Sequence, residues 1–234
     1  MSISENLARV HEQIFTAARR SGRNPDEILL MAVSKTQPTE KIREAYAAGQ
    51  RLFGENRVQE FAAKAVELHD LHELDLHLIG HLQTNKAAKS AELFSAVDSL
   101  DSLRLAEKLN AAAGILNKKL RVLIEVNVGG EAAKSGVAPE SAEFDELLRA
   151  VPRLDSLVFR GLMTVPPFTE NPEGARPYFH KLRDLGNKIS ARKFPWISMD
   201  ELSMGMSHDF EVAIEEGSTC VRVGTAIFGA RAKA

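Results

Sequence analysis

The stretch LRVLIEVNV at residues 120–128 is the clearest strand in the chain, and it decides the fold class. It is a nearly continuous apolar run, which is typical of a strand buried on both faces of a parallel sheet. A helical pattern of apolar residues precedes it at residues 105–112, and another follows at residues 144–151. The stretch therefore predicts a strand with a helix on either side, the repeating unit of an α/β protein.

The same alternation extends in both directions along the chain. Eight short runs are predicted as strands, at residues 28–33, 51–54, 76–80, 93–97, 120–128, 157–165, 201–204 and 219–223. Helical patterns lie between them, and parallel strands joined in this way have right-handed crossovers. Eight such units predict a closed (β/α)8 TIM barrel. An open doubly wound sheet is the rival fold, but no Gly-x-Gly-x-x-Gly motif follows the first predicted strand.

An additional amphipathic helix is expected before the barrel, at about residues 2–21. Its apolar residues recur at intervals of three and four, and the pattern stops at Ser21-Gly22, where glycine is a common helix end signal. No linker rich in Pro, Gly or Ser interrupts the chain. We therefore expect residues 1–234 to form a single barrel domain.

Composition excludes several classes of protein. The chain has 30 Lys and Arg against 32 Asp and Glu, so it has no basic excess for binding nucleic acid. Its one cysteine, Cys220, excludes an internal disulfide and a cysteine-based zinc site. His77 and His81 would lie about 13 Å apart on a strand, so no metal is expected. The polar, periodic N-terminus predicts neither a signal peptide nor a membrane span, which favours the cytoplasm.

Lys35 is the first candidate for chemistry, because it directly follows the apolar strand at residues 28–33. Working residues of such barrels lie at the C-terminal ends of the strands. Burial there lowers the pKa of an amine, and a neutral amine is what Schiff-base formation requires. The alternative is a lysine that keeps its charge in water while its stem lies on the protein.

The segments Ser203–Ser207 and Gly224-Thr225 follow the seventh and eighth predicted strands, where such barrels often bind phosphate. The Ser207 and Thr225 hydroxyls and free backbone N–H groups suit an anion. The alternative is ordinary helix capping and turn chemistry.

Arg222 is predicted to face the inside of the barrel, because Val221 and Val223 alternate with it along the last strand. A buried arginine needs a partner. That partner is either a ligand or an internal carboxylate such as Glu125.

Five segments resemble the pyridoxal phosphate homeostasis proteins. They are AVSKTQP (32–38), FGENRVQE (53–60), HLIGHLQTNK (77–86), GLMTVPP (161–167) and ELSMGMSHDFEVAIEEGSTCVRVGTAIFG (201–229). They occur in the same order as in that family and cover nearly the whole chain. The family resembles the barrel domain of alanine racemase and related fold-type III enzymes, standing alone.

The resemblance implies that pyridoxal 5′-phosphate (PLP) is the cofactor and that it is held as a Schiff base on Lys35. It places the phosphate around Ser203, Met204, Ser207, Gly224 and Thr225. It places Arg222 at the pyridine nitrogen and Asn56 near the ring, while Met163, His81 and Asn85 match family positions around the mouth.

The same resemblance implies a carrier of PLP that supplies apo-enzymes, rather than an enzyme. Arg222 cannot give the ring nitrogen a proton, which makes the ring a weaker electron sink. Alanine racemases take a second base, a tyrosine, from an additional β-domain, and we expect none here, because the sequence ends at Ala234. Tyr46 and Tyr178 fall within predicted outer helices.

Two other functions are compatible with a barrel that carries a lysine at a strand end. A PLP-dependent, racemase-like enzyme acting on amino acids is the alternative, since it would share the fold and the lysine. A phosphosugar aldolase that uses Lys35 is disfavoured by the order of the motifs. Because no second domain is expected to build the racemase dimer, we expect a monomer.

Overall fold

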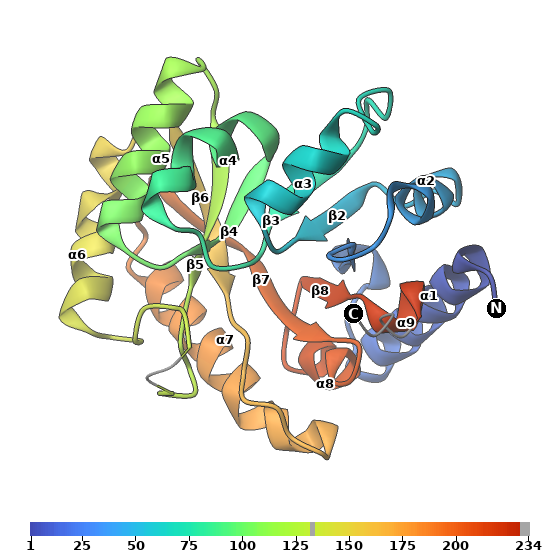
Figure 1. The fold of residues 1–234 in the computed structure, drawn as a ribbon. Coiled ribbons are helices and arrows are strands. Elements are labelled where there is room, and N and C mark those ends of the chain that lie inside the picture. The colour runs from blue at the N-terminus through green and yellow to red at the C-terminus, as the bar shows by residue number, and fades with distance from the viewer. Residues whose placement is uncertain (132–133, 230–234) are drawn as a thin grey trace.

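The computed structural model describes residues 1–131 and 134–229, in which eight parallel strands form a closed barrel (Figure 1). Each strand pairs with its neighbours in sequence, and β8 pairs with β1 to close the ring. The strands are β1 (Leu29–Val33), β2 (Leu52–Glu55), β3 (Asp75–Leu78), β4 (Ala96–Leu100), β5 (Leu120–Glu125), β6 (Leu157–Met163), β7 (Ile197–Met206) and β8 (Cys220–Val223). The predicted (β/α)8 barrel is confirmed.

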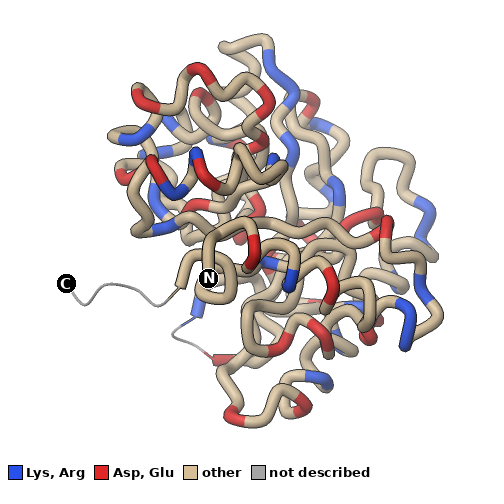
Figure 2. Tube along the Cα trace, turned by 90° about the vertical axis from the view of Figure 1, so that its right-hand side faces the viewer, with Lys and Arg blue, Asp and Glu red and all other residues tan. Residues whose placement is uncertain are grey.

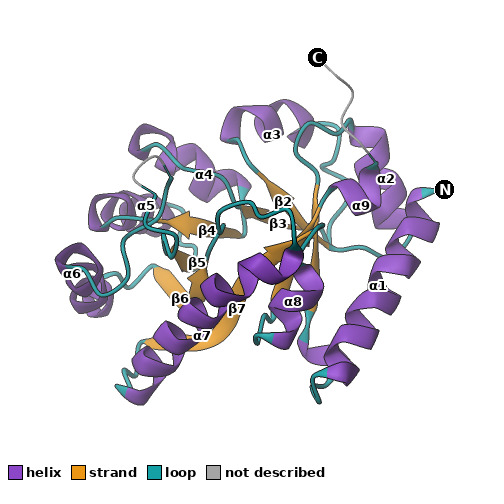
Figure 3. Cartoon of the chain, turned by 90° about the horizontal axis from the view of Figure 1, so that it is seen from below, coloured by secondary structure: helices purple, strands orange, loops and turns teal. Residues whose placement is uncertain are grey.

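Helices surround the strands, as the view from below shows (Figure 3). They are α1 (Ile3–Arg20), α2 (Thr39–Ala47), α3 (Val58–Ala65), α4 (Ala87–Leu93), α5 (Leu103–Ile115), α6 (Ala142–Ala150), α7 (Arg176–Ala191), α8 (Phe210–Glu215) and α9 (Thr225–Phe228). Short 3-10 helices lie at Pro25–Glu27, Thr84–Lys86, Val151–Arg153 and Pro172–Ala175. The short helix α9 after the last strand matters below, because it begins at the site.

Helix α1 covers the outside of the barrel where β8 meets β1. It starts with a capping box, in which Ser2 and Glu5 bond each other's backbone N–H groups. Its apolar stripe is buried, and the helix packs against α2, α8 and α9. Asn6 Nδ2 donates a hydrogen bond of 2.9 Å to the carbonyl oxygen of Ile227 in α9. Helix α1 therefore supports the short helix that follows the last strand.

Two kinds of buried residue alternate along the strands. One set faces the helices and forms the main apolar core, for example Val221 and Val223 on β8. The other set faces the barrel interior and is partly polar, with His77, Asp98 and Arg222 all buried. Interiors of such barrels are usually filled by branched apolar residues. The polar residues of this interior therefore depart from the usual apolar filling.

Most strand bounds differ from the predicted ones by one to three residues, and those of β4 and β7 differ most. The strand expected at residues 93–97 lies at Ala96–Leu100, and Leu93 ends α4 instead. The apolar pattern is interrupted by Asp98 and Ser99, which are buried inside the barrel and hide the strand from a hydrophobicity analysis. Likewise β7 begins at Ile197 rather than at residue 201, because Asp200 and Glu201 break its apolar run.

Charges of both signs are distributed over the fold. Figure 2 shows basic and acidic residues interspersed along the trace. Many are paired, as in the contacts of Arg176 with Glu173, Glu215 and Glu216. Within residues 1–131 and 134–229, no helix is long and apolar enough to cross a membrane.

We predict that Gly161→Ala opens the contact between β6 and β7. A Cβ at residue 161 would overlap the carbonyl oxygen of Glu201, which is backbone and cannot swing away. We expect an unfolding free energy lower by about 3 kcal/mol. Gly22→Ala is the control, because its Cβ would meet open space and only its φ of +72° opposes alanine, at a cost of about 1 kcal/mol. Urea denaturation measures the unfolding free energy of both variants. Equal losses would contradict the close contact between residue 161 and Glu201.

Candidate functional site

A cavity of about 480 Å³ lies at the C-terminal ends of the strands, within the size range of small-molecule sites. Loops after several different strands contribute to it. Its lining consists of Val33, Lys35, Asn56, Ile79, Val165, Phe168, Met206, Ser207, His208, Arg222, Gly224 and Thr225. Working residues of barrels of this class occupy this rim.

Lys35 is half-buried on the segment that leaves β1, and its neighbours hold that segment on both sides. The Ser34 hydroxyl donates a hydrogen bond of 2.8 Å to Oε1 of the buried Glu55 at the end of β2. Thr36 has a φ of +62°, which costs a β-branched residue about 1–2 kcal/mol. Its N–H donates to the carboxylate of Glu60 on α3. The backbone around Lys35 is therefore fixed at the rim.

Arg222 lies at the floor of the cavity and is only 3% exposed. Its Nη1 donates to the Ser203 hydroxyl and its Nη2 to the carbonyl oxygen of Thr164, both at 2.7 Å. Burial lowers the pKa of the guanidinium, but arginine keeps its charge in proteins. In the described part of the chain no ion pair joins Arg222 to Glu125, so its direct partners are neutral.

Glu125 ends β5 and is buried in the interior, where its Oε2 has no hydrogen-bond partner among the described residues. Burial and, to a smaller extent, the charge of Asp101 raise the pKa of its carboxyl to about 7 against the opposing effect of Arg222. Glu125 is therefore expected to change protonation near neutral pH.

The loops after β7 and β8 meet at Ser207 and Gly224. The N–H of Gly224 donates a hydrogen bond of 3.1 Å to the Ser207 hydroxyl. Upstream, Gly205 has a φ of +92°, and a Cβ there would collide with Ala213 and Phe210 of α8. That glycine lets α8 pack closely against the end of β7, and Ser207 follows in the turn between them, at the cavity.

Six of the nine predicted cofactor-binding residues line the cavity together. They are Lys35, Asn56, Ser207, Arg222, Gly224 and Thr225. Ser203, Met204 and Met163 are buried below and do not line it. The Ser203 hydroxyl receives the Arg222 hydrogen bond, and Met204 belongs to the apolar core. The predicted contacts of these three with a cofactor stay predictions.

Part of the apolar wall was not predicted from the sequence as lining. Val165 and Phe168 follow β6 and are 39% and 79% exposed. The Phe168 ring lies 5.6 Å from that of His208, whose Nε2 is 3.2 Å from the carbonyl oxygen of Thr169. An irregular loop has no hydrophobic period that would predict which residues face the cavity. The one signal in the sequence was the pair of apolar residues, Val165 and Phe168, on either side of Pro166-Pro167.

His81 and Asn85 lie beside the main cavity rather than in it. His81 is exposed, and its Nδ1 is 3.2 Å from a carboxylate oxygen of Asp101. It lines a neighbouring cavity of about 280 Å³ that shares Asn56 with the main one and also includes Lys86. Asn85 is exposed in the 3-10 helix after β3.

Comparison with known proteins identifies the family of this chain. The closed barrel of eight parallel strands is the fold of the alanine racemase N-terminal domain. The family model of the alanine racemase N-terminal domain matches residues 6–232. The chain belongs to this family and, within it, to the pyridoxal phosphate homeostasis proteins.

Two relatives of that name are closely similar. The protein of Aquifex aeolicus is 48% identical and that of Escherichia coli 46% identical, over 99% and 98% of this chain and 99% and 97% of theirs. PipY of Synechococcus elongatus, solved with PLP bound, has a TM-score of 0.85 at 39% identity, covering 97% of this chain and 100% of that one.

A more distant likeness concerns the fold alone. Alanine racemase of Clostridium difficile has a TM-score of 0.71 at 16% identity, and the match covers 99% of this chain but 57% of the racemase.

Glu125 generates a prediction about pH. Because its folded pKa of about 7 lies above the ordinary 4.5, the folded state binds the proton more tightly than the unfolded state. Its contribution to stability is thus complete below about pH 4.5 and is lost as the pH rises through about 7, a change of about 3 kcal/mol.

We therefore expect Glu125→Gln to be less sensitive to pH than the wild type. Urea denaturation at about pH 5 and about pH 8 should show the wild type losing about 2–3 kcal/mol more than the variant across that interval. Parallel losses in both proteins would contradict the raised pKa of Glu125.

Proposed function

We propose that this chain binds PLP covalently and reversibly through Lys35 and serves PLP homeostasis by supplying the cofactor to apo-enzymes. The observation that carries the proposal is that an amine, an arginine and two hydroxyl groups line one cavity at the rim. We place this function in the cytoplasm and assign it to the monomer.

The donor set of the cavity fits the groups of PLP. Ser207 and Thr225 offer hydroxyls after strands seven and eight, beside the start of the short helix α9, where barrels of this class often bind phosphate. Gly224 has an ordinary φ of −113°, and a Cβ there would meet Val33 only at 3.4–3.5 Å. Neither the backbone nor the packing demands glycine at this position, so we infer that it leaves room for the ligand.

Each group of the chain has one task in this proposal. PLP supplies an aldehyde carbon that a neutral primary amine attacks reversibly with loss of water. Lys35 provides that amine from a backbone fixed by Glu55 and Glu60. Ser207 and Thr225 bind the phosphate, and Arg222 offers a permanently charged donor to the ring nitrogen and leaves it unprotonated.

We further propose that the chain is not a catalyst. Racemisation requires an acid or base on each face of the substrate, and among the described residues that line the cavity there is no tyrosine: Tyr46 lies in α2 and Tyr178 in α7. His208 also lines the cavity, but its imidazole directs Nε2 to the carbonyl oxygens of Thr169 and Glu170. The relatives are named homeostasis proteins rather than enzymes.

The first test is an absorption titration with PLP. We expect a visible band in the wild type and in Lys89→Ala, a control that removes an exposed lysine of α4, and no band in Lys35→Ala. Borohydride reduction followed by peptide mass mapping should place the adduct on Lys35. A band that survives Lys35→Ala would mean that another amine binds the aldehyde.

A second test concerns the phosphate. Ser207→Ala and Thr225→Val should each weaken PLP binding about 10- to 100-fold, since a lost hydrogen bond to a charged group is worth about 1.5–3 kcal/mol. Binding of pyridoxal, which lacks the phosphate, should change little in the same variants. If both ligands weakened equally, the two hydroxyls would not contact the phosphate.

The carrier and the racemase-like enzyme are separated by hydrogen exchange. With PLP-loaded protein in deuterium oxide, we expect NMR to detect no deuterium incorporation at Cα of any common amino acid beyond that seen with free PLP. Incorporation that Lys35→Ala abolishes would establish the enzyme instead.

A further inference from the structure

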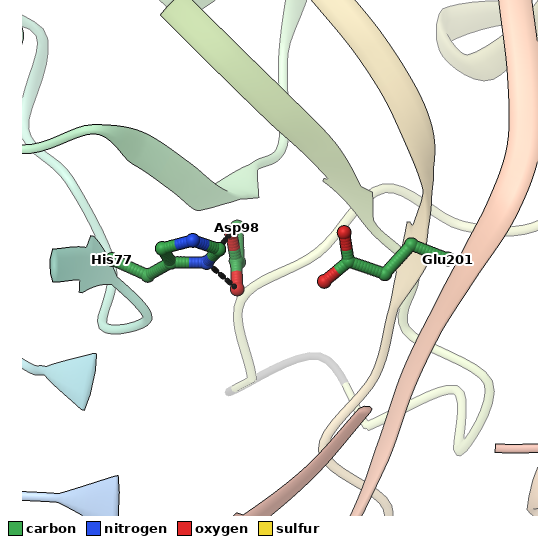
Figure 4. A group of neighbouring side chains, drawn as sticks. All are labelled: His77, Asp98 and Glu201. Atoms are coloured by element: carbon green, nitrogen blue, oxygen red, sulfur yellow. Dashed lines mark hydrogen bonds and ion pairs between the residues drawn. The ribbon is translucent and has the colours of Figure 1, made fainter. Parts of the chain in front are cut away.

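Three side chains meet inside the barrel, away from the cavity described above. His77 on β3, Asp98 on β4 and Glu201 on β7 point toward one another across the interior (Figure 4). One imidazole nitrogen and one oxygen from each carboxylate all lie within 4.8 Å of one another. None of the three lines the Lys35 cavity.

The polar atoms of this cluster are incompletely satisfied. His77 is 3% exposed and Asp98 is fully buried. Within the described residues His77 Nε2, Asp98 Oδ1 and Glu201 Oε1 have no hydrogen-bond partner. Each unsatisfied buried polar group costs folding free energy, and native proteins hold few of them. Two of the three, the carboxylate oxygens of Asp98 and Glu201, indicate that a ligand belongs there, while His77 Nε2 lies on the side of Asp75.

The imidazole is oriented as a metal-ligating histidine is. Its Nδ1 lies 3.1 Å from both carboxylate oxygens of Asp98. Its Nε2 lies 3.7 Å from Oδ1 of Asp75 on the other side, and Asp75 is held by Ser95 and Arg121. Histidines that bind metals usually present their second nitrogen to a carboxylate in this way.

We propose that His77 Nδ1 and the carboxylates of Asp98 and Glu201 bind a divalent first-row transition metal ion, with Zn²⁺ as the probe. One imidazole and two carboxylates are a donor set that such ions accept. Two ligands at about 2.0–2.1 Å from a tetrahedral ion are about 3.3 Å apart, close to the 3.1 Å between His77 Nδ1 and Asp98. Glu201 becomes the third protein ligand after a small movement of its side chain. A water molecule takes the fourth coordination position of the ion.

Charge and access also suit a cation. The charges of two carboxylates and a divalent ion cancel in the interior, where isolated charges are costly. A cation would reach the cluster from the N-terminal ends of the strands. There the side chain of Asp75 is 35% exposed and that of Arg121 is 40% exposed. The ion would join β3, β4 and β7 across the barrel.

The rival occupant is a proton on the imidazole, held by Asp98 and Asp75. The two occupants differ in a measurable way, because a protonated histidine has no affinity for metal.

The test is titration of the full-length, chelator-treated protein with Zn²⁺ by calorimetry. We expect one ion per chain, and an affinity at least 10-fold lower in Asp98→Asn and in Glu201→Gln. His180→Gln is the matched control, since exposed His180 lies 3.2 Å from Asp184 and 3.3 Å from Glu216 but outside the barrel. Absence of binding, affinity unchanged in both cluster variants, or loss in His180→Gln would overturn the proposal.

A second measurement needs no variant, and it therefore tests the metal proposal even if Asp98→Asn and Glu201→Gln fail to fold. Long-range ¹H–¹⁵N NMR spectra of the wild type should show Zn²⁺ shifting Nδ1 of His77 and leaving the proton on Nε2. An unchanged, doubly protonated His77 ring in the presence of Zn²⁺ would overturn the proposal. The result for the metal site is independent of the proposed PLP function, because none of the three cluster residues takes part in the absorption titration with PLP.

Discussion

The buried guanidinium of Arg222 is the constraint on which the rest of the site depends. A charge in a barrel interior is costly unless hydrogen bonds replace its hydration. Here those bonds reach Ser203 on β7 and the Thr164 carbonyl after β6, so one side chain fixes three strand ends. The loops that follow β7 and β8 then meet through Ser207 and Gly224. Lys35 enters the same cavity because β8 pairs with β1.

The sequence predicted the barrel and the positions of the site along the chain, because strands alternate with helices and polar residues follow strand ends. It did not resolve which side chains of one motif face the cavity. Ser207 lines it, whereas Ser203 lies beneath and bonds Arg222; that difference depends on the turn at Gly205. The placement of β4 was wrong because Asp98 is a polar residue inside the barrel, which an apolar pattern cannot anticipate.

The interior of the barrel divides into two polar regions. At the C-terminal rim, Arg222 forms the floor of the proposed PLP site. Nearer the N-terminal ends of the strands, His77, Asp98 and Glu201 form the proposed metal site. Asp98 also acts electrostatically on Arg222, so the lower region helps to compensate the charge of Arg222 when no metal ion is bound there. Because the barrel is shared with alanine racemase at 16% identity and a fold alone does not define a function, both proposals rest on interior and rim side chains.

The most direct test of the carrier account is transfer of PLP from this chain to another protein. The chain would be loaded with PLP, freed of excess cofactor by gel filtration and mixed with an apo-aminotransferase that free PLP is known to activate in the same buffer. The account predicts that the visible band of the carrier decays while aminotransferase activity rises in proportion to the PLP released. A loaded chain that keeps its band while the apo-enzyme stays inactive would contradict it.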